Sequence, residues 1–207
     1  MRTAIALLAA VVLTGAVSAQ QAPPPSTSPT YRVEVLIFRA TTALGGGENW
    51  AAGSGTRYGA HGEAEPAITG QVGRFARSLG RNELQLREVA GKLRASGLYE
   101  PVAHAGWMQT ASPWGTRAGF PIGRLGLSVP GLSGSVFLER GQFLHLGLAL
   151  TYEMANPPEG IGAGPGTRFS LNESRRVRFY ERNYYDHPAF GVIALVTPAQ
   201  GSRPAGR

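Results

Sequence analysis

An unbroken alternation of apolar residues constrains the fold of this chain more than any other feature. Every second residue of the stretch 144–152 is a leucine or a tyrosine, from Leu144 to Tyr152. A period of two places these side chains on one face of a β-strand. Residues 133–140 also have strand character, and the short link through Gly141 predicts that the two strands form an antiparallel hairpin.

The first and last strands are expected at the centre of the sheet. Residues 31–38 and 190–197 are rich in β-branched and aromatic side chains. In the first of them, apolar side chains fall on both faces, Ile37 on one and Leu36 on the other. This pattern is typical of a strand that is covered on both sides.

One main helix is predicted between these strands. Asn82 and Gln85 have the spacing of a capping box, with Asn82 as the N-cap. Apolar residues then recur at helical spacing, which predicts about four turns ending at Gly97; they are Leu86, Val89, Ala90 and Leu93.

Two further strands, at residues 99–109 and 168–179, and a turn at 184–188 complete the expected elements. The fold class is α+β: a mostly antiparallel sheet of five to seven strands, with one main helix packed on a face.

The ends of the chain indicate export. Residues 1–19 have a basic start, an apolar run and a small-residue pattern at Ala19, which together predict a cleaved secretory signal peptide. The run is shorter than the roughly 20 apolar residues of a membrane-spanning helix, so no transmembrane segment is expected after cleavage. A Pro/Ser/Thr linker (20–30), a single domain (31–198) and a disordered tail (199–207) are expected to follow.

Composition narrows the chemistry. The chain has no cysteine, so it lacks disulfides and thiolate metal sites. Glycine is abundant, above all in residues 41–80, and a poorly ordered excursion is expected over residues 41–73. The formal charge of +7 favours anionic partners. For an exported chain these are envelope polyanions, and nucleic acid is not expected.

No pattern of catalytic residues stands out. The four histidines, at positions 61, 104, 145 and 187, lack metal-ligand spacing, so no metal or other cofactor is expected. Asp186 is the sole aspartate and adjoins His187, where neighbours on an extended chain point apart, so a catalytic triad is poorly supported. A cell-wall hydrolase that uses two of the glutamates stays open as an alternative.

The segment 175–188 combines arginines, tyrosines and the sole aspartate. Arginine binds carboxylates in bidentate fashion, and we expect tyrosine rings to stack on sugars. The ligand-binding residues predicted here are Arg175, Arg176, Arg178, Tyr180, Arg182 and Tyr185. A structural turn is predicted at Asp186, His187 and Pro188. The alternative interpretation is that these arginines pair with Glu173 and Glu181 and guard a strand edge.

Several blocks, taken together, resemble the CsiV peptidoglycan-binding family. In chain order they are Tyr31-Arg-Val-Glu-Val-Leu-Ile-Phe-Arg39, Trp107-Met-Gln109, Gln142-Phe-Leu-His-Leu146, Glu173-Ser-Arg-Arg-Val-Arg178 and Tyr185-Asp-His-Pro-Ala-Phe-Gly191 with Val196-Thr-Pro198. Residues 41–80 match little of the family's pattern, and Val177 stands where the family more often has methionine.

The resemblance implies a non-enzymatic periplasmic protein of Gram-negative bacteria that binds peptidoglycan and supports cell-wall synthesis and cell shape. It also implies an association with a penicillin-binding synthase and the synthase's lipoprotein activator. Two alternatives stay open: an envelope protein–protein interaction module without direct glycan binding, and the hydrolase.

Overall fold

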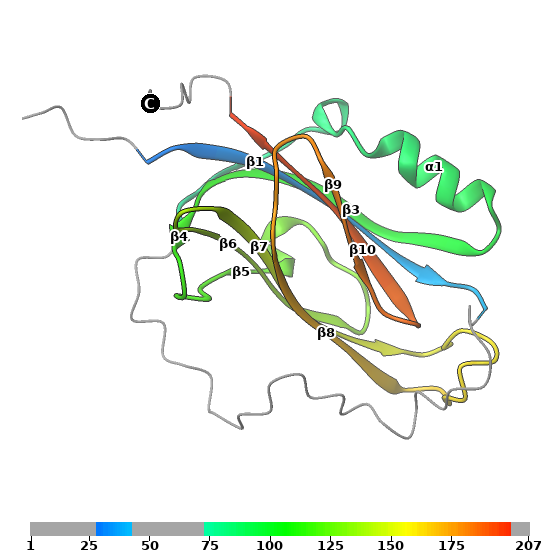
Figure 1. The fold of residues 1–207 in the computed structure, drawn as a ribbon. Coiled ribbons are helices and arrows are strands. Elements are labelled where there is room, and N and C mark those ends of the chain that lie inside the picture. The colour runs from blue at the N-terminus through cyan, green and yellow to red at the C-terminus, as the bar shows by residue number, and fades with distance from the viewer. Residues whose placement is uncertain (1–27, 43–72, 200–207) are drawn as a thin grey trace, which may run out of the picture.

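The computed structural model describes residues 28–42 and 73–199, and within them the fold is mostly β (Figure 1). Two largely antiparallel sheets pack face to face, and one short helix, α1 (Arg87–Ala95), lies on the outside of the first sheet. The predicted α+β class is confirmed. The expected single sheet is instead a pair, and the sequence pattern alone did not separate them.

The strands of the first sheet follow the order β2-β3-β1-β10-β9. Their bounds are β1 Thr30–Ala40, β2 Phe75–Ser78, β3 Tyr99–Thr110, β9 Arg182–Asp186 and β10 Phe190–Pro198. β1 is central and pairs antiparallel with both β3 and β10, as expected from its apolar residues on two faces.

The second sheet has the order β4-β6-β7-β8, and β5 also pairs with β6. Its strands are β4 Ser112–Pro113, β5 Phe120–Pro121, β6 Leu132–Arg140, β7 Leu144–Met154 and β8 Thr167–Arg176. The predicted β6–β7 hairpin is confirmed, with Leu138 opposite Leu146 and Leu132 opposite Tyr152.

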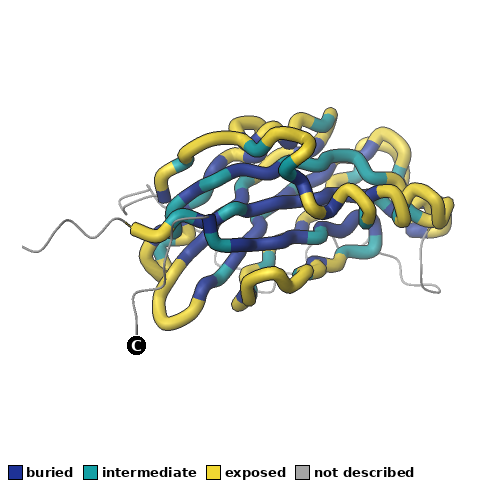
Figure 2. The backbone as a smooth tube through the Cα atoms, turned by 90° about the horizontal axis from the view of Figure 1, so that it is seen from above, coloured by how far each residue is buried: buried dark blue, intermediate teal, exposed yellow. Residues whose placement is uncertain are grey.

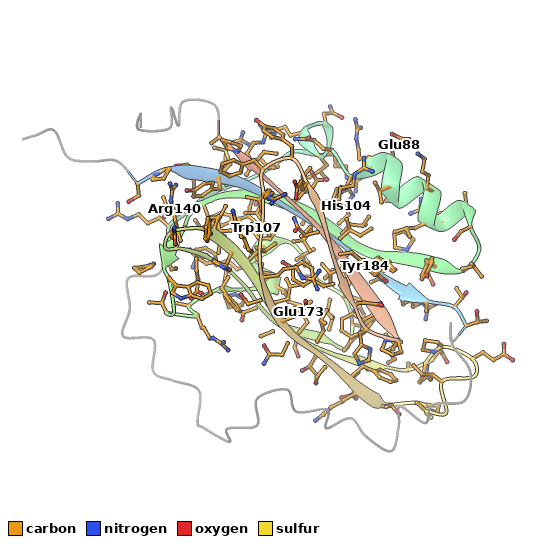
Figure 3. The ribbon with its side chains drawn as sticks, in the orientation of Figure 1. Glu88, His104, Trp107, Arg140, Glu173 and Tyr184 are labelled. Carbon is orange, nitrogen blue, oxygen red and sulfur yellow. The ribbon has the colours of Figure 1, made fainter. Side chains whose placement is uncertain are left out.

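The main core lies between the two sheets. The alternating leucines of β7 and the inward residues of β1, such as Val35 and Ile37, belong to one buried cluster. Trp107 of β3 is fully buried in it, and its indole N–H donates to the side chain of Gln109 at 2.6 Å, which satisfies the polar end of the ring (Figure 3). Burial follows the strands and gives way to exposure at the turns (Figure 2).

The helix begins later than the sequence predicts. The chain forms a short 3₁₀ helix at Arg81–Glu83, and α1 starts only at Arg87 and runs for 9 residues. A carboxylate from a distant strand causes the change. Glu34 of β1 accepts hydrogen bonds from the backbone N–H groups of Gln85 at 2.8 Å and Leu86 at 2.7 Å, just before the helix.

Glu34 is buried, and its carboxylate also lies 2.7 Å from Nε2 of His104. Burial alone would raise the pKa of Glu34, but the hydrogen bonds from His104, Gln85 and Leu86 outweigh it and hold the pKa below its ordinary value of 4.5. The helix is thus fixed to β1 by a buried charged group, in addition to its apolar contacts with Leu36.

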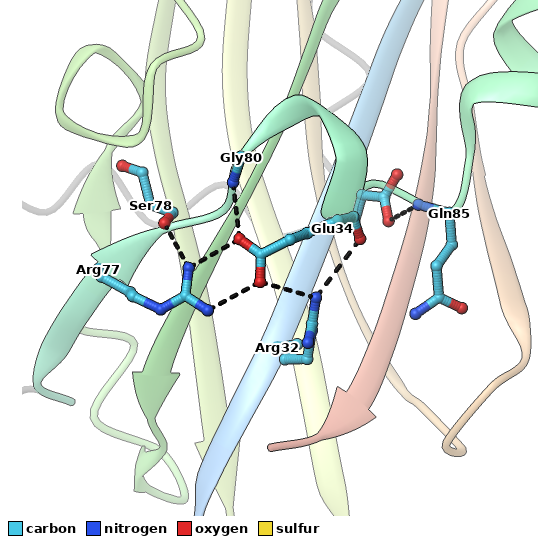
Figure 4. Close-up of polar contacts among 7 residues, drawn as sticks. Arg32, Glu34, Arg77, Ser78, Gly80 and Gln85 are labelled. Carbon is cyan, nitrogen blue, oxygen red and sulfur yellow. Dashed lines mark hydrogen bonds and ion pairs between the residues drawn. The ribbon is translucent and has the colours of Figure 1, made fainter. Parts of the chain in front are cut away.

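A second carboxylate organises the same loop (Figure 4). Glu83 accepts two hydrogen bonds of 2.8 Å from the guanidinium of Arg77 and one from the backbone N–H of Gly80. Arg32 of β1 contacts it at 3.4 Å. Glu83 therefore caps the 3₁₀ helix, whereas the predicted N-cap, Asn82, does not cap α1, whose N-cap is Leu86.

The structure also revises the chain around residues 177–188. β8 ends at Arg176, three residues earlier than predicted, and Tyr184 and Tyr185 lie in strand β9 rather than in a turn. The reversal comes later, between Asp186 and Phe190. Because Tyr180 has a left-handed backbone, with φ of 65°, Arg176, Arg178 and Tyr180 do not share one face of an extended strand.

Gly147 of β7 is required by a ring that lies against it. A Cβ built at this position would come within 1.9 Å of the Phe137 ring. Gly147→Ala is therefore expected to lower the free energy of unfolding by about 1–3 kcal/mol through overpacking. Gly91→Ala in the middle of α1, where a Cβ meets nothing within 4 Å, is expected to raise it by up to about 1 kcal/mol. Urea denaturation measures both, and equal effects would contradict the steric account.

The predicted signal peptide, most of the predicted linker, the Gly-rich stretch from 43 to 72 and the predicted tail beyond 199 fall outside the described residues. Within the described residues, no helix has the length and apolar character needed to cross a membrane.

Candidate binding surface

The structure places two of the predicted binding residues in structural roles. Tyr185 is fully buried, and its hydroxyl donates to the backbone oxygen of Leu146 at 2.9 Å, which links the first sheet to the second. Burial raises the pKa of this phenol, so it remains a donor. Tyr185 is therefore out of reach of a ligand, a correction to the prediction.

Arg175 is also occupied within the protein. Its guanidinium pairs with Glu173, donates to the backbone oxygen of Tyr184 at 2.7 Å and lies 4.7 Å from the centre of the Tyr185 ring. These contacts tie β8 to β9, as in the structural alternative for the arginines.

Arg182 lies apart from the other arginines. It is exposed on β9, on the outside of the first sheet, where its positive charge attracts the carboxylate of Glu88 of α1. Among the described residues it forms no ion pair.

The segment 186–188 leads into the reversal between β9 and β10. Nδ1 of His187 accepts a hydrogen bond from the backbone N–H of Ala189 at 3.1 Å, whereas Asp186 accepts one from the hydroxyl of Tyr184 at 2.8 Å. The histidine, rather than the aspartate, therefore holds the turn backbone.

His187 gives the fold a pH dependence. Burial lowers the pKa of its imidazole below the ordinary value of 6.5, against the attraction of Asp186. The unfolded chain then binds the proton more readily, so this group's contribution to stability is lost as pH falls below 6.5. His187→Gln is expected to make the fall in unfolding free energy between pH 7 and 5 shallower than in the unchanged protein. Parallel pH profiles from urea denaturation would contradict this assignment.

Exposed aromatic side chains gather at the end of the sandwich where β6 turns into β7 and β8 leaves its sheet. Four of the six large apolar side chains that are exposed in the described residues lie here: Trp114, Phe143, Phe179 and Tyr180. Trp114 is 57% exposed and Tyr180 70%. With Arg140, Arg176 and Arg178 they form what we call the aromatic–arginine end.

Backbone hydrogen bonds bring these segments together from distant parts of the sequence. The N–H of Trp114 donates to the oxygen of Arg140 at 3.2 Å. The N–H of Val177 donates to Leu144 at 2.9 Å, which places the start of the β8–β9 connection beside the hairpin. The N–H of Tyr180 then donates to Val196 of β10 at 3.1 Å, which anchors the connection to the first sheet.

Side-chain contacts orient the aromatic rings and the arginines. The guanidinium of Arg176 lies 3.5 Å from the centre of the Phe143 ring, and the Trp114 ring lies 4.0 Å from that of His145. Phe179 stacks on Tyr31 at 5.9 Å. Arg140 points toward β1 and donates to the Tyr31 hydroxyl (Figure 3). Such contacts limit rotamer freedom, so less entropy is lost on binding.

The charge at this end is predominantly positive. Arg178 has a partner, Glu181 at 3.6 Å, and both side chains are largely exposed. Neither Arg140 nor Arg176 forms an ion pair with a carboxylate of the described residues. The nearby Glu139 is buried and accepts hydrogen bonds from the backbone N–H of Arg117 and the hydroxyl of Thr116, so it has a structural role. The guanidinium of Arg176 is thus available to an anionic ligand, whereas that of Arg140 is engaged with Tyr31.

Of the residues at the aromatic–arginine end, the sequence prediction included Arg176, Arg178 and Tyr180 but not Trp114 and Phe143. Trp114 follows a two-residue strand in a turn-rich stretch, and its position depends on the pairing of β4 with β6. The turn Ser-Pro-Trp-Gly was a usable signal, because turns and loops lie on the protein surface. In the part of the chain that the structure describes, no group of three or more metal-ligating side chains occurs.

These features define a β-sandwich with an exposed surface suited to ligand binding. A family model described as "Peptidoglycan-binding protein, CsiV" matches residues 2–199, so the chain belongs to the CsiV family. The family is described as a binding protein, and no catalytic function is attached to it. Searches of curated proteins and of solved structures found no match.

Proposed function

We propose that this protein is exported to the periplasm and binds peptidoglycan there through its aromatic–arginine end. Two neighbouring features carry the proposal: the exposed Trp114 ring, which lies against His145, and the guanidinium of Arg176, which is opposite His145 on β8 and lacks a carboxylate partner among the described residues. The family's description supplies the ligand.

The two kinds of side chain suit the two parts of peptidoglycan. Aromatic rings present flat apolar faces that can stack on sugar rings, while their polar edges stay in water. Guanidinium groups form short, charge-assisted hydrogen bonds with carboxylates, which the stem peptides carry. Arg176 and Arg178 would bind the peptide carboxylates, and Trp114 and Tyr180 the sugars.

Export and the cellular role form the remaining part of the proposal. The signal-peptide pattern of residues 1–19 supports a periplasmic location. The family resemblance supports a role in wall synthesis and cell shape, with a penicillin-binding synthase and its lipoprotein activator as partners. Arg182, on the far side of the first sheet, is not part of the proposed binding surface.

A second function, protein–protein interaction without glycan contact, is favoured by another exposed patch. Leu98 and Tyr184 are both exposed on the outside of the first sheet. The Tyr184 ring stacks on Phe38 at 6.0 Å, and Tyr99 meets Phe38 edge-on at 5.2 Å. This patch is aromatic, and the exposed Arg182 lies two residues from Tyr184 on the same strand.

Co-sedimentation of the purified protein with isolated sacculi, at low and at moderate salt, tests the proposal. Binding that weakens as salt rises is expected, since the arginines contribute electrostatically. Absence from the pellet at both salt concentrations would leave the interaction-module function. Release of soluble wall fragments during the incubation would instead indicate a hydrolase.

A further inference from the structure

The outer face of the second sheet is built in rows that run across three strands. Residues directly opposite one another on paired strands project to the same side. On the side away from the core, the register of β6, β7 and β8 gives four rows. Row one is Ser133, Thr151 and Ser170; row two is Ser135, Ala149 and Asn172; row three is Phe137, Gly147 and Ser174; row four is Glu139, His145 and Arg176.

Rows one and two carry no charge and no large side chain. Ser133, Ser170 and Asn172 are exposed, and Ala149 is partly exposed between them. The hydroxyls of Thr151 and Ser170 lie 3.4 Å apart across two strands. The groups presented to solvent are hydroxyls and an amide, each able both to donate and to accept hydrogen bonds.

No large side chain projects from row three. The Phe137 ring lies over Gly147, which has no side chain, and both residues are buried. Ser174 is the exposed member of the row. The uncharged surface therefore continues without a ridge from row one to row three.

Row four joins this face to the aromatic–arginine end. It contributes Arg176, with its guanidinium on Phe143, and His145, which lies against the exposed Trp114 ring. Nδ1 of His145 is buried and has no hydrogen-bond partner in the described residues. A polar atom without a hydrogen bond therefore lies between row four and the Trp114 ring. At the opposite limit, Arg168 pairs with Glu153 at 2.8 Å.

We infer that rows one to three bind the glycan backbone of the wall. Row four is the boundary beyond which the surface contacts the stem peptide instead. The inference rests on the proposed function and assigns the two halves of the ligand to two parts of one surface. The sugar backbone is rich in hydroxyl and amide groups. It matches rows one to three, which carry no charge and no projecting side chain that would clash with it. A stem peptide, which carries charged groups, finds complementary charge only at row four and beyond.

The dimensions fit an extended polymer better than a single small molecule. Rows on a strand are two residues apart, so rows one to four span about 20 Å at roughly 3.4 Å per residue. A polymer along this face would make many weak contacts, with the Trp114 ring as its aromatic anchor at one end.

Peptide-free glycan strands, prepared from sacculi with an amidase, provide the test ligand. The unchanged protein is expected to bind these strands nearly equally at low and high salt, because rows one to three contribute no charge. Ala149→Leu, which raises a ridge at the centre of row two, is expected to weaken strand binding at least tenfold. Ala95→Leu, the same change at an exposed position of α1, is the control and should leave binding unchanged.

The outcomes separate the inference from the proposed function. Binding to intact sacculi without binding to peptide-free strands would overturn the inference and leave the proposed function standing, whereas binding to neither would overturn both. Strand binding unaffected by Ala149→Leu would also overturn the inference. A dimer in sedimentation velocity that Ala149→Leu dissociates would make this face a contact between two copies of the chain, and would equally overturn it. If Ala149→Leu does not fold, Asn172→Leu in the same row is measured in its place.

Discussion

Glu34→Ala is expected to destabilise the protein by about 3 kcal/mol, since a hydrogen bond to a charged group contributes roughly 1.5–3 kcal/mol and buried donors left without a partner cost more. The change removes the acceptor of two backbone N–H groups and of His104. It also removes the hydrogen bonds that hold the start of α1 against β1. Urea denaturation gives the loss of stability, and hydrogen exchange at the Gln85 and Leu86 amides should accelerate.

Glu88→Ala provides the matched control. Glu88 lies on α1 itself, but it is 73% exposed and its ion pair is with Lys92, one turn away. Such an exposed pair contributes about 0.5 kcal/mol or less. If the two variants lose similar stability, the carboxylate of Glu34 does not hold the helix.

Replacing Trp114 and Arg176 together with alanine is expected to reduce sacculus binding at least tenfold, because tryptophan and arginine are the residues whose truncation most often costs more than 1 kcal/mol of binding energy. Both side chains are exposed, so the melting temperature should change little. Co-sedimentation across a protein titration measures the binding, and thermal unfolding measures the stability.

The control for this double variant is Arg94→Ala with Leu98→Ala. It removes the same charge and a large exposed apolar side chain, from the region of α1 instead. Equal loss of binding in the two double variants would show that binding depends on total charge and exposed apolar area, and not on the aromatic–arginine end in particular. A large fall in melting temperature for the first would show that the aromatic–arginine end is structural.

Much of the fold could be predicted because local patterns determined it. The alternation from Leu144 to Tyr152 fixed which face of β7 is buried, and the short link through Gly141 fixed its hairpin partner. Apolar residues on both faces of β1 indicated its central place. These features depend on neighbours along the chain, which a sequence displays directly.

The errors arose where residues far apart in the sequence decide the structure. The start of α1 depends on Glu34, which lies some fifty positions away in sequence, and no pattern near Asn82 reports it. The burial of Tyr185 and the pairing of Arg175 depend on two sheets packing together, whereas the sequence suggested one. The Arg/Tyr segment was therefore read correctly as exposed at Arg178 and Tyr180, but not at Tyr185.

The same long-range packing created the surface that the sequence did not display. Trp114 and Phe143 belong to separate turns, and both come to lie beside the end of β8 through strand pairing. The rows of the second sheet are likewise a product of register between three strands. A binding surface of this kind is assembled by the sheet, so its residues carry no common motif.

Hydrogen–deuterium exchange with solubilised peptidoglycan fragments tests most directly the claim that the wall is bound at the aromatic–arginine end. The account predicts slower exchange, on adding fragments, in residues 112–117, 140–145 and 176–181, with no change in α1. Protection confined to α1 or to the patch around Leu98 and Tyr184, with the three predicted segments unchanged, would contradict it.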